Sequence, residues 1–278
     1  MGSILYSVEM RLERVGAADS GTITGHHLLA LLLRLIDTSD PRLAEELHRD
    51  SVVKPLTISP ILPTRRKASV PGEGGILSCR ITFLDERVFA ALADAIWRLH
   101  SDAELNLGGM CVRCRGLATT PMESRWAKFT SFSSLLENAS LDKKLGLEFL
   151  SPTTFRSSGR GERNVIFPEP ALVFGSLINR WNAVAGADLK LDFSVKDASM
   201  AKVSGYHLTT RMVDFGNYQE LGFIGRVTYE CGDGLSEGQV RVLNALTDFA
   251  FYAGVGAKTT MGMGQCQRVK FAPKACSK

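Results

Sequence analysis

The chain lacks any apolar run long enough to cross a membrane. Its longest uninterrupted apolar segment, residues 28–33, ends at Arg34, whereas a membrane-spanning helix needs about 20 predominantly apolar residues. The N-terminus also lacks the basic segment followed by an apolar stretch that marks a secretory leader. We therefore expect a soluble, cytoplasmic protein with no membrane partner.

Metal-ligand patterns are scarce as well. The six cysteines yield one C-x-x-C pair, Cys111 and Cys114, and neither a second pair nor two histidines occur at zinc-site spacing. The pair falls in a strand predicted over residues 110–116, where side chains three apart point to opposite faces of the sheet. We expect both cysteines to pack in the structure, with metal binding or redox chemistry as the weaker alternative. No metal and no cofactor are predicted.

Two common nucleotide-binding patterns are missing. A phosphate loop of the NTPase type runs from strand through glycine loop to helix and ends in Gly-Lys-Ser/Thr, and the dinucleotide fingerprint has the same order of elements. The glycine-dense segment of this chain, residues 254–264, instead follows a predicted helix and precedes a predicted strand. Its lysine is not preceded by glycine, so an NTP or dinucleotide site is disfavoured.

This glycine loop does favour a phosphate-bearing partner of another kind. Glycine permits positive φ and close backbone approach, so the loop can offer backbone N–H groups, two hydroxyls and one ammonium to phosphate. The simpler alternative is a flexible turn between helix and strand. The candidate binding residues are Gly254, Gly256, Lys258, Thr259, Thr260, Gly262 and Gly264.

Charge is nearly balanced, with a net value of +4 that is unevenly placed. Residues 1–140 hold 16 basic and 16 acidic side chains, whereas residues 141–278 hold 17 and 13. This mild basic excess suggests a polyanionic partner without proving one. A composition of 45% hydrophobic and 22% charged residues is that of a globular protein with one large or two ordinary domains.

The same order of elements occurs twice along the chain. Alternating apolar residues at 4–12 predict a strand with one buried face, and Asp40 and Pro41 are typical of an N-cap and a first helical residue. The first copy is expected to have strands at residues 4–12, 56–62, 76–84 and 110–116, and helices at 26–36, 41–48 and 85–99.

The second copy repeats the arrangement after a connector rich in Ser and Thr. Strands are expected at residues 145–150, 203–214, 223–231 and 264–271, and helices at 169–184 and 236–252, with an irregular segment at 151–168. Both copies read β-α-β-β-α-β, so we predict an α+β protein with tandem ferredoxin-like (RRM-like) domains. The predicted boundaries are an N-terminal domain at 1–120, a connector at 121–142 and a C-terminal domain at 143–278.

Four motifs in this order give the chain a family resemblance. They are D-P-x-L-A-x-x-L-H at residues 40–48, K-P-L-T-I-S-P at 54–60, L-S-P-T-T-F at 150–155, and F-A-F-Y-A at 249–253 running into the glycine loop. With two ferredoxin-like units, the chain resembles the CRISPR-associated endoribonucleases that cut repeat RNA, the Cas-six family of the RAMP superfamily. The resemblance extends over most of the chain.

The resemblance implies metal-independent cleavage of CRISPR precursor transcripts within the repeat. The ribose 2′-OH would attack the adjacent phosphate, leaving a 2′,3′-cyclic phosphate and a 5′-OH, to make guide RNA. The implied partners are the hairpin stem of the repeat and other subunits of a CRISPR effector complex, with the chain a monomer or homodimer. Two alternatives remain: a non-catalytic crRNA-binding subunit of the same fold, and a nucleotide-binding protein with an incidental glycine loop.

Acid–base candidates are few, because the chain has five histidines. His48, at the end of a predicted helix, matches the family's catalytic histidine, and Lys54 matches its lysine and would supply a cation. His26 and His27 open the helix of residues 26–36, where a helix N-terminus attracts phosphate; one of them is a candidate second acid or base, and N-terminal capping is the alternative. Some relatives carry a tyrosine near the position of Leu33. The leucine side chain of this chain cannot transfer protons.

Three arginines complete the predicted site. Arg156, Arg160 and Arg163 fall in a loop rich in Ser and Gly, and guanidinium is the preferred bidentate ligand of phosphate. The resemblance implies that this loop grips the duplex stem, with a solvated surface loop as the alternative. Arg65, Arg66 and Lys67 are weaker candidates for an auxiliary contact.

Overall fold

The first half of the chain folds around a mixed-length antiparallel sheet. The structure is a computed structural model that describes residues 4–16, 22–49, 53–63, 72–156 and 164–271. The strand order is β2-β3-β1-β5-β4, and β6 pairs with the start of β1. The strands are β1 (Ile4–Arg14), β2 (Leu56–Ile61), β3 (Ile76–Phe83), β4 (Glu104–Leu107), β5 (Met110–Ala118) and β6 (Lys128–Ser131).

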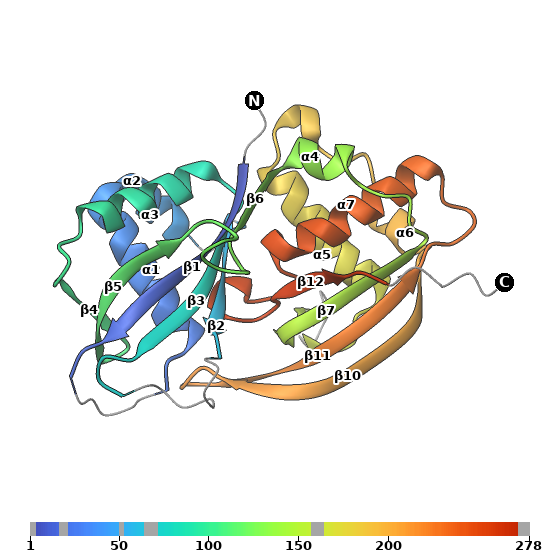
Figure 1. The fold of residues 1–278 in the computed structure, drawn as a ribbon. Helices are drawn as coiled ribbons and strands as arrows, with labels where there is room; N and C mark the ends of the chain where they lie inside the picture. Colours follow the sequence, from blue (N-terminus) through green and yellow to red (C-terminus); the bar gives the residue numbers. More distant parts are fainter. Residues whose placement is uncertain (1–3, 17–21, 50–52, 64–71, 157–163, 272–278) are drawn as a thin grey trace.

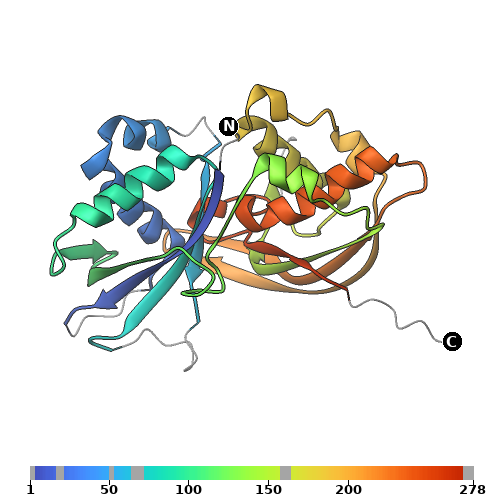
Figure 2. The same ribbon diagram turned by 45° about the horizontal axis from the view of Figure 1, so that its top comes forward.

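Three helices cover one face of this sheet, as Figures 1 and 2 show from two directions. They are α1 (Gly25–Ser39), α2 (Pro41–His48) and α3 (Glu86–Arg98). Val8, Met10 and Leu12 alternate along β1 and are at most 1% exposed, so their face of the strand packs under the leucine-rich α1. The alternation read from the sequence therefore sets which face of the sheet the helices cover.

The second half repeats the design with a four-stranded sheet of order β10-β11-β7-β12. Its strands are β7 (Lys144–Thr153), β10 (Lys202–Asp214), β11 (Gln219–Glu230) and β12 (Cys266–Val269), with a small pair β8 (Phe155–Arg156) and β9 (Asn164–Val165). The helical elements are α4 (Phe132–Glu137), α5 (Pro170–Val184), α6 (Val195–Ala198), α7 (Glu237–Ala253) and the 3-10 turns η1 (Ala187–Leu189) and η2 (Thr259–Met261).

Both sheets have the strand order of a ferredoxin-like unit, which confirms the predicted fold class. In each, the first strand pairs with the third and the fourth, and the second strand lies at an edge. The structure differs from the predicted elements in three places. Strand β4, which was not predicted, forms a hairpin with β5, and β7 continues through Thr153 into the segment expected to be irregular. The last strand is shorter than expected, at Cys266–Val269.

The expected connector at 121–142 carries structure of its own. Its β6 extends the first sheet through β1, whereas Phe132 of α4 is fully buried in the second core against Trp181 and Phe249. The connector therefore belongs to both domains. Its Ser- and Thr-rich composition gave no periodic signal for so short a strand and helix.

Buried hydrogen bonds join the two domains. On β3, Arg80 Nη2 donates to the carbonyl of Phe251 at 2.7 Å, and Thr82 Oγ1 donates to that of Tyr252 at 2.5 Å. Both carbonyls belong to the last turn of α7, where the negative end of the helix dipole favours a cation such as the guanidinium of Arg80. From the other side, Gln265 Nε2 lies 3.3 Å from both Thr57 Oγ1 and the Ile58 carbonyl.

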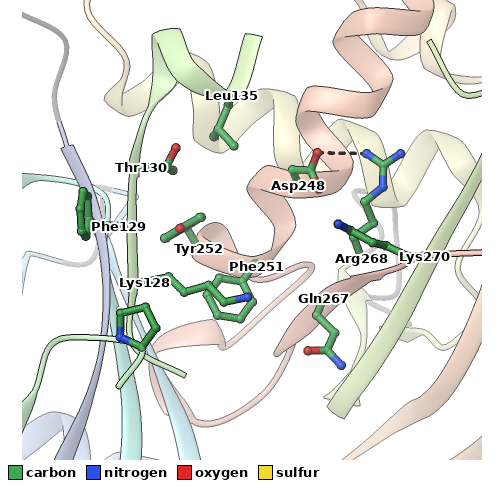
Figure 3. A pocket seen from close by; sticks show the side chains of 11 residues that line it. Lys128, Phe129, Thr130, Leu135, Asp248, Phe251, Tyr252, Gln267, Arg268 and Lys270 are labelled. Carbon is green, nitrogen blue, oxygen red and sulfur yellow. Dashed lines mark hydrogen bonds and ion pairs between the residues drawn. The ribbon is translucent and has the colours of Figure 1, made fainter. Parts of the chain in front are cut away.

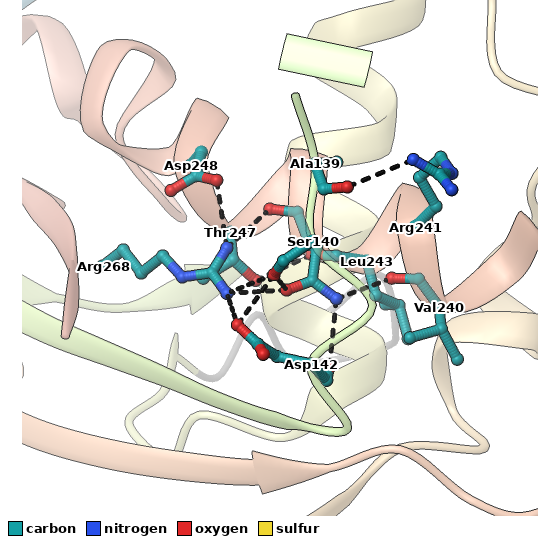
Figure 4. Close-up of polar contacts among 10 residues, drawn as sticks. Ala139, Ser140, Asp142, Val240, Arg241, Leu243, Thr247, Asp248 and Arg268 are labelled. Carbon is teal, nitrogen blue, oxygen red and sulfur yellow. Dashed lines mark hydrogen bonds and ion pairs between the residues drawn. The ribbon is translucent and has the colours of Figure 1, made fainter. Parts of the chain in front are cut away.

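Arg268 of β12 anchors the end of the connector, as Figure 4 shows. Its guanidinium pairs with Asp142 and Asp248, each at 3.0 Å, and donates to Asn244 Oδ1 at 2.6 Å. Asn244 is fully buried on α7 and donates to the Asp142 carbonyl at 3.0 Å. The start of β7 is thereby fixed against α7.

None of the helices in the described ranges combines the length and apolarity required to cross a membrane.

Candidate active site

His48 lies at the exposed end of α2. Asp40 caps this helix by accepting the Leu43 N–H at 3.0 Å, and Pro41 occupies its first turn. Leu43, Ala44 and Leu47 are buried, so the helix is held by one face and presents His48 to solvent in its last turn.

Lys54 lies beside the same helix end. Its Nζ donates to the carbonyl of Leu47, the residue before His48, at 2.6 Å. The structure therefore brings an ammonium next to the backbone of the predicted catalytic histidine. Lys54 also lines a cavity of about 330 Å³, which it shares with Gly256, Lys258, Thr259 and Thr260 of the glycine loop.

The wall of this cavity includes polar residues of α5. Arg180 Nη2 donates to the Gly256 carbonyl at 3.3 Å, and Ser176 Oγ accepts the Gly256 N–H at 3.0 Å. Burial lowers the pKa of Arg180 to about 10, which still leaves it charged near neutrality. The cavity thus joins cationic side chains of both domains, Lys54 from the first and Arg180 from the second.

The glycines of the loop are required by the chain's own packing. Gly254, Gly256, Gly262 and Gly264 all have positive φ, between 63° and 95°. A Cβ on Gly256 would lie 2.4 Å from the Thr154 carbonyl oxygen, and one on Gly264 would lie 2.1 Å from that of Val255. At Gly262, by contrast, the nearest atoms belong to Pro60 at 3.5 Å. Close backbone approach therefore occurs within the molecule at two of the four positions.

Many backbone N–H groups of the loop are also paired internally. The Val255 N–H reaches the Gly264 carbonyl at 2.8 Å, and the Ala257 N–H reaches the Thr154 carbonyl at 2.9 Å. Thr259 is 2% exposed, and its hydroxyl has no hydrogen-bond partner within the described part of the chain. Thr259, one of the loop residues predicted to bind phosphate, thus has a buried, unused hydroxyl, and the residue lines the cavity.

Lys258 has a second partner system that the sequence did not suggest. It has φ of 56°, which is uncommon for a residue with a side chain. Its Nζ forms an ion pair with Glu220 of β11 and lies 4.1 Å from the ring centroid of Tyr218. Lys258 is therefore fixed against the β10–β11 hairpin as well as lining the cavity.

The N-terminus of α1 lies against the glycine loop. A Cβ on Gly25 would lie 1.9 Å from the Met261 carbonyl oxygen, so only glycine fits there. His26 is exposed. His27 is half-buried: its Nδ1 accepts the Thr24 N–H at 3.3 Å, and its ring lies directly against Gly108. Both histidines lie at the N-terminus of α1, as the sequence predicts, and His27 has the capping role that was the alternative to chemistry.

The arginine cluster is described in part. Arg156 is exposed at the end of β8, pairing with Asn164 of β9. Arg160 and Arg163, and the auxiliary candidates Arg65, Arg66 and Lys67, lie outside the described residues.

The remaining candidates do not join this site. His100 pairs with Asp102 on the surface, and His207 is exposed on β10. Cys114 packs on the first core, whereas Cys111 donates to Glu104 on the other face of β5, as the strand spacing predicts. No group of three or more His, Cys, Asp or Glu side chains suited to a metal ion occurs within the described ranges.

A larger hollow of about 440 Å³ lies where β6 meets α7 and β12 (Figure 3). Lys128 reaches over the ring of Phe251 at 4.7 Å, and Arg268 and Lys270 line the far side. The hollow holds none of the residues predicted from the sequence to act on RNA.

Two family models match consecutive parts of the chain. The N-terminal domain of CRISPR Cas6 matches residues 5–137, and the CRISPR-associated endoribonuclease Cas6 model matches residues 147–266. The chain belongs to the Cas6 family. The boundary between the two Cas6 models falls after α4, so the first model takes in most of the predicted connector.

Curated Cas6 relatives are about a quarter identical to the chain over the aligned residues. A CRISPR-associated endoribonuclease Cas6 of Mycobacterium tuberculosis is 26% identical over 169 residues, which cover 60% of this chain and 52% of the relative. One from Streptococcus thermophilus is 29% identical over 118 residues, which cover 42% and 46%. The chain therefore spans about half the length of the curated relatives it matches.

Solved Cas6 structures superpose along almost the whole chain. A Thermus thermophilus Cas6 in a product complex has a TM-score of 0.81 at 27% identity, covering 95% of this chain and all of that one. A Cas6 substrate-mimic complex has a TM-score of 0.69 at 26% identity, covering 96% and 100%. A Cas6-related protein of Pyrococcus furiosus, 15% identical with a TM-score of 0.58, shares the fold.

Sequence reasoning missed three residues that shape this site: Gly25, Arg180 and Glu220. A usable signal existed for Arg180, which is the only charged residue in the otherwise apolar and neutral segment 170–184. Gly25 and Glu220 become informative only through contacts with residues far away in the sequence, so no local pattern marks them.

Proposed function

We propose that this chain is an endoribonuclease that cleaves CRISPR precursor transcripts within the repeat. The observation that carries the proposal is the contact between Lys54 Nζ and the Leu47 carbonyl, 2.6 Å long. It holds an ammonium beside His48 and at the cavity lined by the glycine loop. Family membership and the likeness to Cas6 complexes with product and substrate mimic support this assignment.

The proposed reaction is an internal transesterification. A base removes the proton of the ribose 2′-OH, whose oxygen attacks the adjacent phosphorus, and the bond from phosphorus to the 5′-oxygen breaks. An acid supplies a proton to that leaving oxygen. The products are a 2′,3′-cyclic phosphate and a 5′-OH. His48 performs one proton transfer, and Lys54 stabilises the added negative charge of the phosphorane.

The second proton-transfer group comes from the N-terminus of α1, from His26 or His27. Because Nδ1 of His27 accepts the Thr24 N–H, its neutral ring carries the proton on Nε2 and is a donor there. That state leaves neither ring nitrogen free to act as a base, and it makes Nε2–H a hydrogen-bond donor to a phosphate oxygen. His26 is exposed and without such a restriction. Comparing His26→Ala with His27→Ala in single-turnover cleavage identifies the participant.

Binding of the hairpin stem is assigned to the exposed Arg156, the glycine loop and, outside the described residues, Arg160 and Arg163. Phosphate contacts of this kind make affinity salt-dependent, with a slope of about 0.7–0.9 per contact. Replacing all three arginines with Ala is expected to lower the slope by roughly two to three.

The test is cleavage of a labelled repeat hairpin in EDTA. Proton transfer and a lysine cation need no metal ion, so cleavage is expected to persist, with a 2′,3′-cyclic phosphate on the upstream product. Loss of cleavage in EDTA with recovery in Mg²⁺ would reject the metal-independent mechanism. Tight hairpin binding without cleavage under either condition would support the rival function, a non-catalytic crRNA-binding subunit.

A further inference from the structure

A separate hollow of about 270 Å³ lies between the end of β2 and the start of the last strand. Its apolar side is formed by consecutive residues of the first domain and by Leu150 of the second. Its polar side is formed by two arginines, two serines and one glutamine. The lining residues are Ser59, Pro60, Ile61, Leu62, Pro63, Arg80, Arg125, Trp126, Leu150, Ser151 and Gln265.

Arg80 is the unusual member of this lining. It is 1% exposed, and within the described ranges its Nε and Nη1 have no hydrogen-bond partner, whereas Nη2 donates to the Phe251 carbonyl. Its guanidinium lies 4.3 Å from the ring centroid of Phe251 and 5.5 Å from that of Trp126. Burial lowers the pKa of Arg80 to about 10, so it stays charged near neutrality.

Among the residues that the structure describes, no carboxylate lines the hollow. A buried charge is costly unless it is paired and hydrogen-bonded, and of the three guanidinium nitrogens only Nη2 has an acceptor in this part of the chain, the Phe251 carbonyl. Arg125 adds a second cation at the exposed side, 4.5 Å above the Trp126 ring. The hollow is thus an electropositive site with unused donors.

Gln265 adds an acceptor to the same hollow. It is 3% exposed, and its Oε1 has no partner among the residues described here, while its amide nitrogen bonds to the first domain. Beside it, Ser151 Oγ accepts the Gln265 N–H at 2.9 Å. A phosphate alone would satisfy Arg80 but would leave the carbonyl oxygen of Gln265 unpaired. A ligand that has both an anionic group and an O–H or N–H donor satisfies both.

The hollow is continuous with the glycine loop. Pro60, which lines it, lies 3.5 Å from the Cβ position of Gly262. Lys54 of the candidate active site precedes β2, and Pro60 and Ile61 end it. Six residues of extended strand span about 20 Å, so the hollow lies several nucleotides away from Lys54.

We infer that this hollow binds one unpaired ribonucleotide of the RNA, with its phosphate toward Arg80 and Arg125 and a ribose hydroxyl or base N–H toward Gln265 Oε1. The apolar side formed by Pro60, Ile61 and Leu150 receives the base or sugar. The inference rests on the proposed function, because it takes the ligand to be a single-stranded part of the same transcript. Free inorganic phosphate is the competing source of the anion.

The test compares two cleavage-blocked repeat RNAs, the hairpin alone and the hairpin with single-stranded flanks, each with a 2′-deoxy nucleotide at the cut. The flanks are expected to increase affinity for the wild-type chain. Arg125→Ala is expected to weaken binding of the flanked RNA about tenfold, the loss of one charge-assisted contact. Its salt slope for the flanked RNA is expected to fall by about 0.7.

Arg98→Ala is the matched control, because Arg98 is an exposed arginine on α3 that forms an ion pair with Asp94. A 4-thiouridine placed along the flanks is expected to cross-link to the peptide containing Trp126. This measurement uses the wild-type chain, so it does not require a variant of the buried Arg80, whose contact with α7 the fold needs.

Each failure has its own signature. If the wild-type chain does not bind the hairpin, the proposed function fails. If it binds the hairpin but the flanks add no affinity, or Arg125→Ala weakens both RNAs equally, the nucleotide site is wrong. The last measurement adds inorganic phosphate to the wild-type chain. If phosphate changes the tryptophan fluorescence but does not compete with the flanked RNA, the hollow binds free phosphate and the inference is wrong.

Discussion

Among single residues, the exposed His48 is the one on which the proposed proton transfer depends most directly. We expect His48→Ala to reduce single-turnover cleavage of the repeat hairpin by about 10²–10⁴-fold, the usual contribution of a general acid or base. Hairpin affinity should change little, because the side chain is exposed at a helix end. His100→Ala is the matched control, since His100 pairs with Asp102 on the surface. Cleavage by the His48 variant within about threefold of wild type would remove it from the mechanism.

Lys258 and Glu220 give a residue-level test of stability. Their side chains are 12% and 9% exposed, and breaking a buried ion pair from one side leaves an uncompensated charge. Lys258→Met is therefore expected to lower the free energy of unfolding by about 3 kcal/mol, and Glu220→Gln in the same chain to restore much of it. The measurement is urea unfolding of both single variants and the double variant.

The opposite pattern would identify Lys258 as a ligand rather than a structural residue. In that case Lys258→Met would keep wild-type stability and lose RNA affinity, and the second substitution would have no effect on either quantity.

At the scale of elements, the glycine loop allows two destabilising effects of an added side chain to be measured separately: the strain of a positive φ and the clash of the Cβ with neighbouring backbone. Gly262 and Gly264 both have positive φ, which costs an L-residue about 1–2 kcal/mol. A Cβ at Gly262 has room, whereas one at Gly264 would lie 2.1 Å from the Val255 oxygen. We expect Gly262→Ala to lose about 1–2 kcal/mol of unfolding free energy, and Gly264→Ala to lose distinctly more. Equal losses in urea unfolding would show that the clash relaxes without cost.

The same comparison bears on function. Because the backbone at Gly264 is used internally, its substitution should impair folding first. Gly262→Ala, once shown to be folded, reports on whether RNA approaches the loop there. Unchanged hairpin affinity in that variant would leave the loop as a structural turn.

For the whole molecule, the two domains are joined by buried hydrogen bonds, so we expect them to unfold together. Thr82→Val removes the hydroxyl that donates to the Tyr252 carbonyl and bonds to Thr57 at 2.7 Å. Leaving these buried groups unpaired should cost about 1–3 kcal/mol and speed hydrogen exchange in the last turn of α7. Thr210→Val on the exposed part of β10 is the control. If hydrogen exchange becomes faster throughout the second domain while the last turn of α7 keeps its protection, the result would argue against this coupling.

Local patterns were sufficient for the elements and for the position of the candidate acid–base groups. Alternation along β1, the Asp40-Pro41 start of α2 and the apolar face of that helix are properties of neighbouring residues. They predict that His48 falls in the last turn of a helix, and the structure shows that it is exposed there. The short β6 and α4 escaped prediction, because four and six residues give too few repeats for a periodic signal.

What the sequence by itself determined is the tandem β-α-β-β-α-β order, the glycine loop and the residues available for chemistry. Only the tertiary structure decided how they meet: that Lys54 lies on the end of α2, that Lys258 is paired with Glu220, and that Arg80 is buried with unused donors between the domains. The physical reason is range. Helix and strand periodicity depends on residues a few positions apart, whereas burial and ion pairing depend on residues brought together from distant parts of the chain.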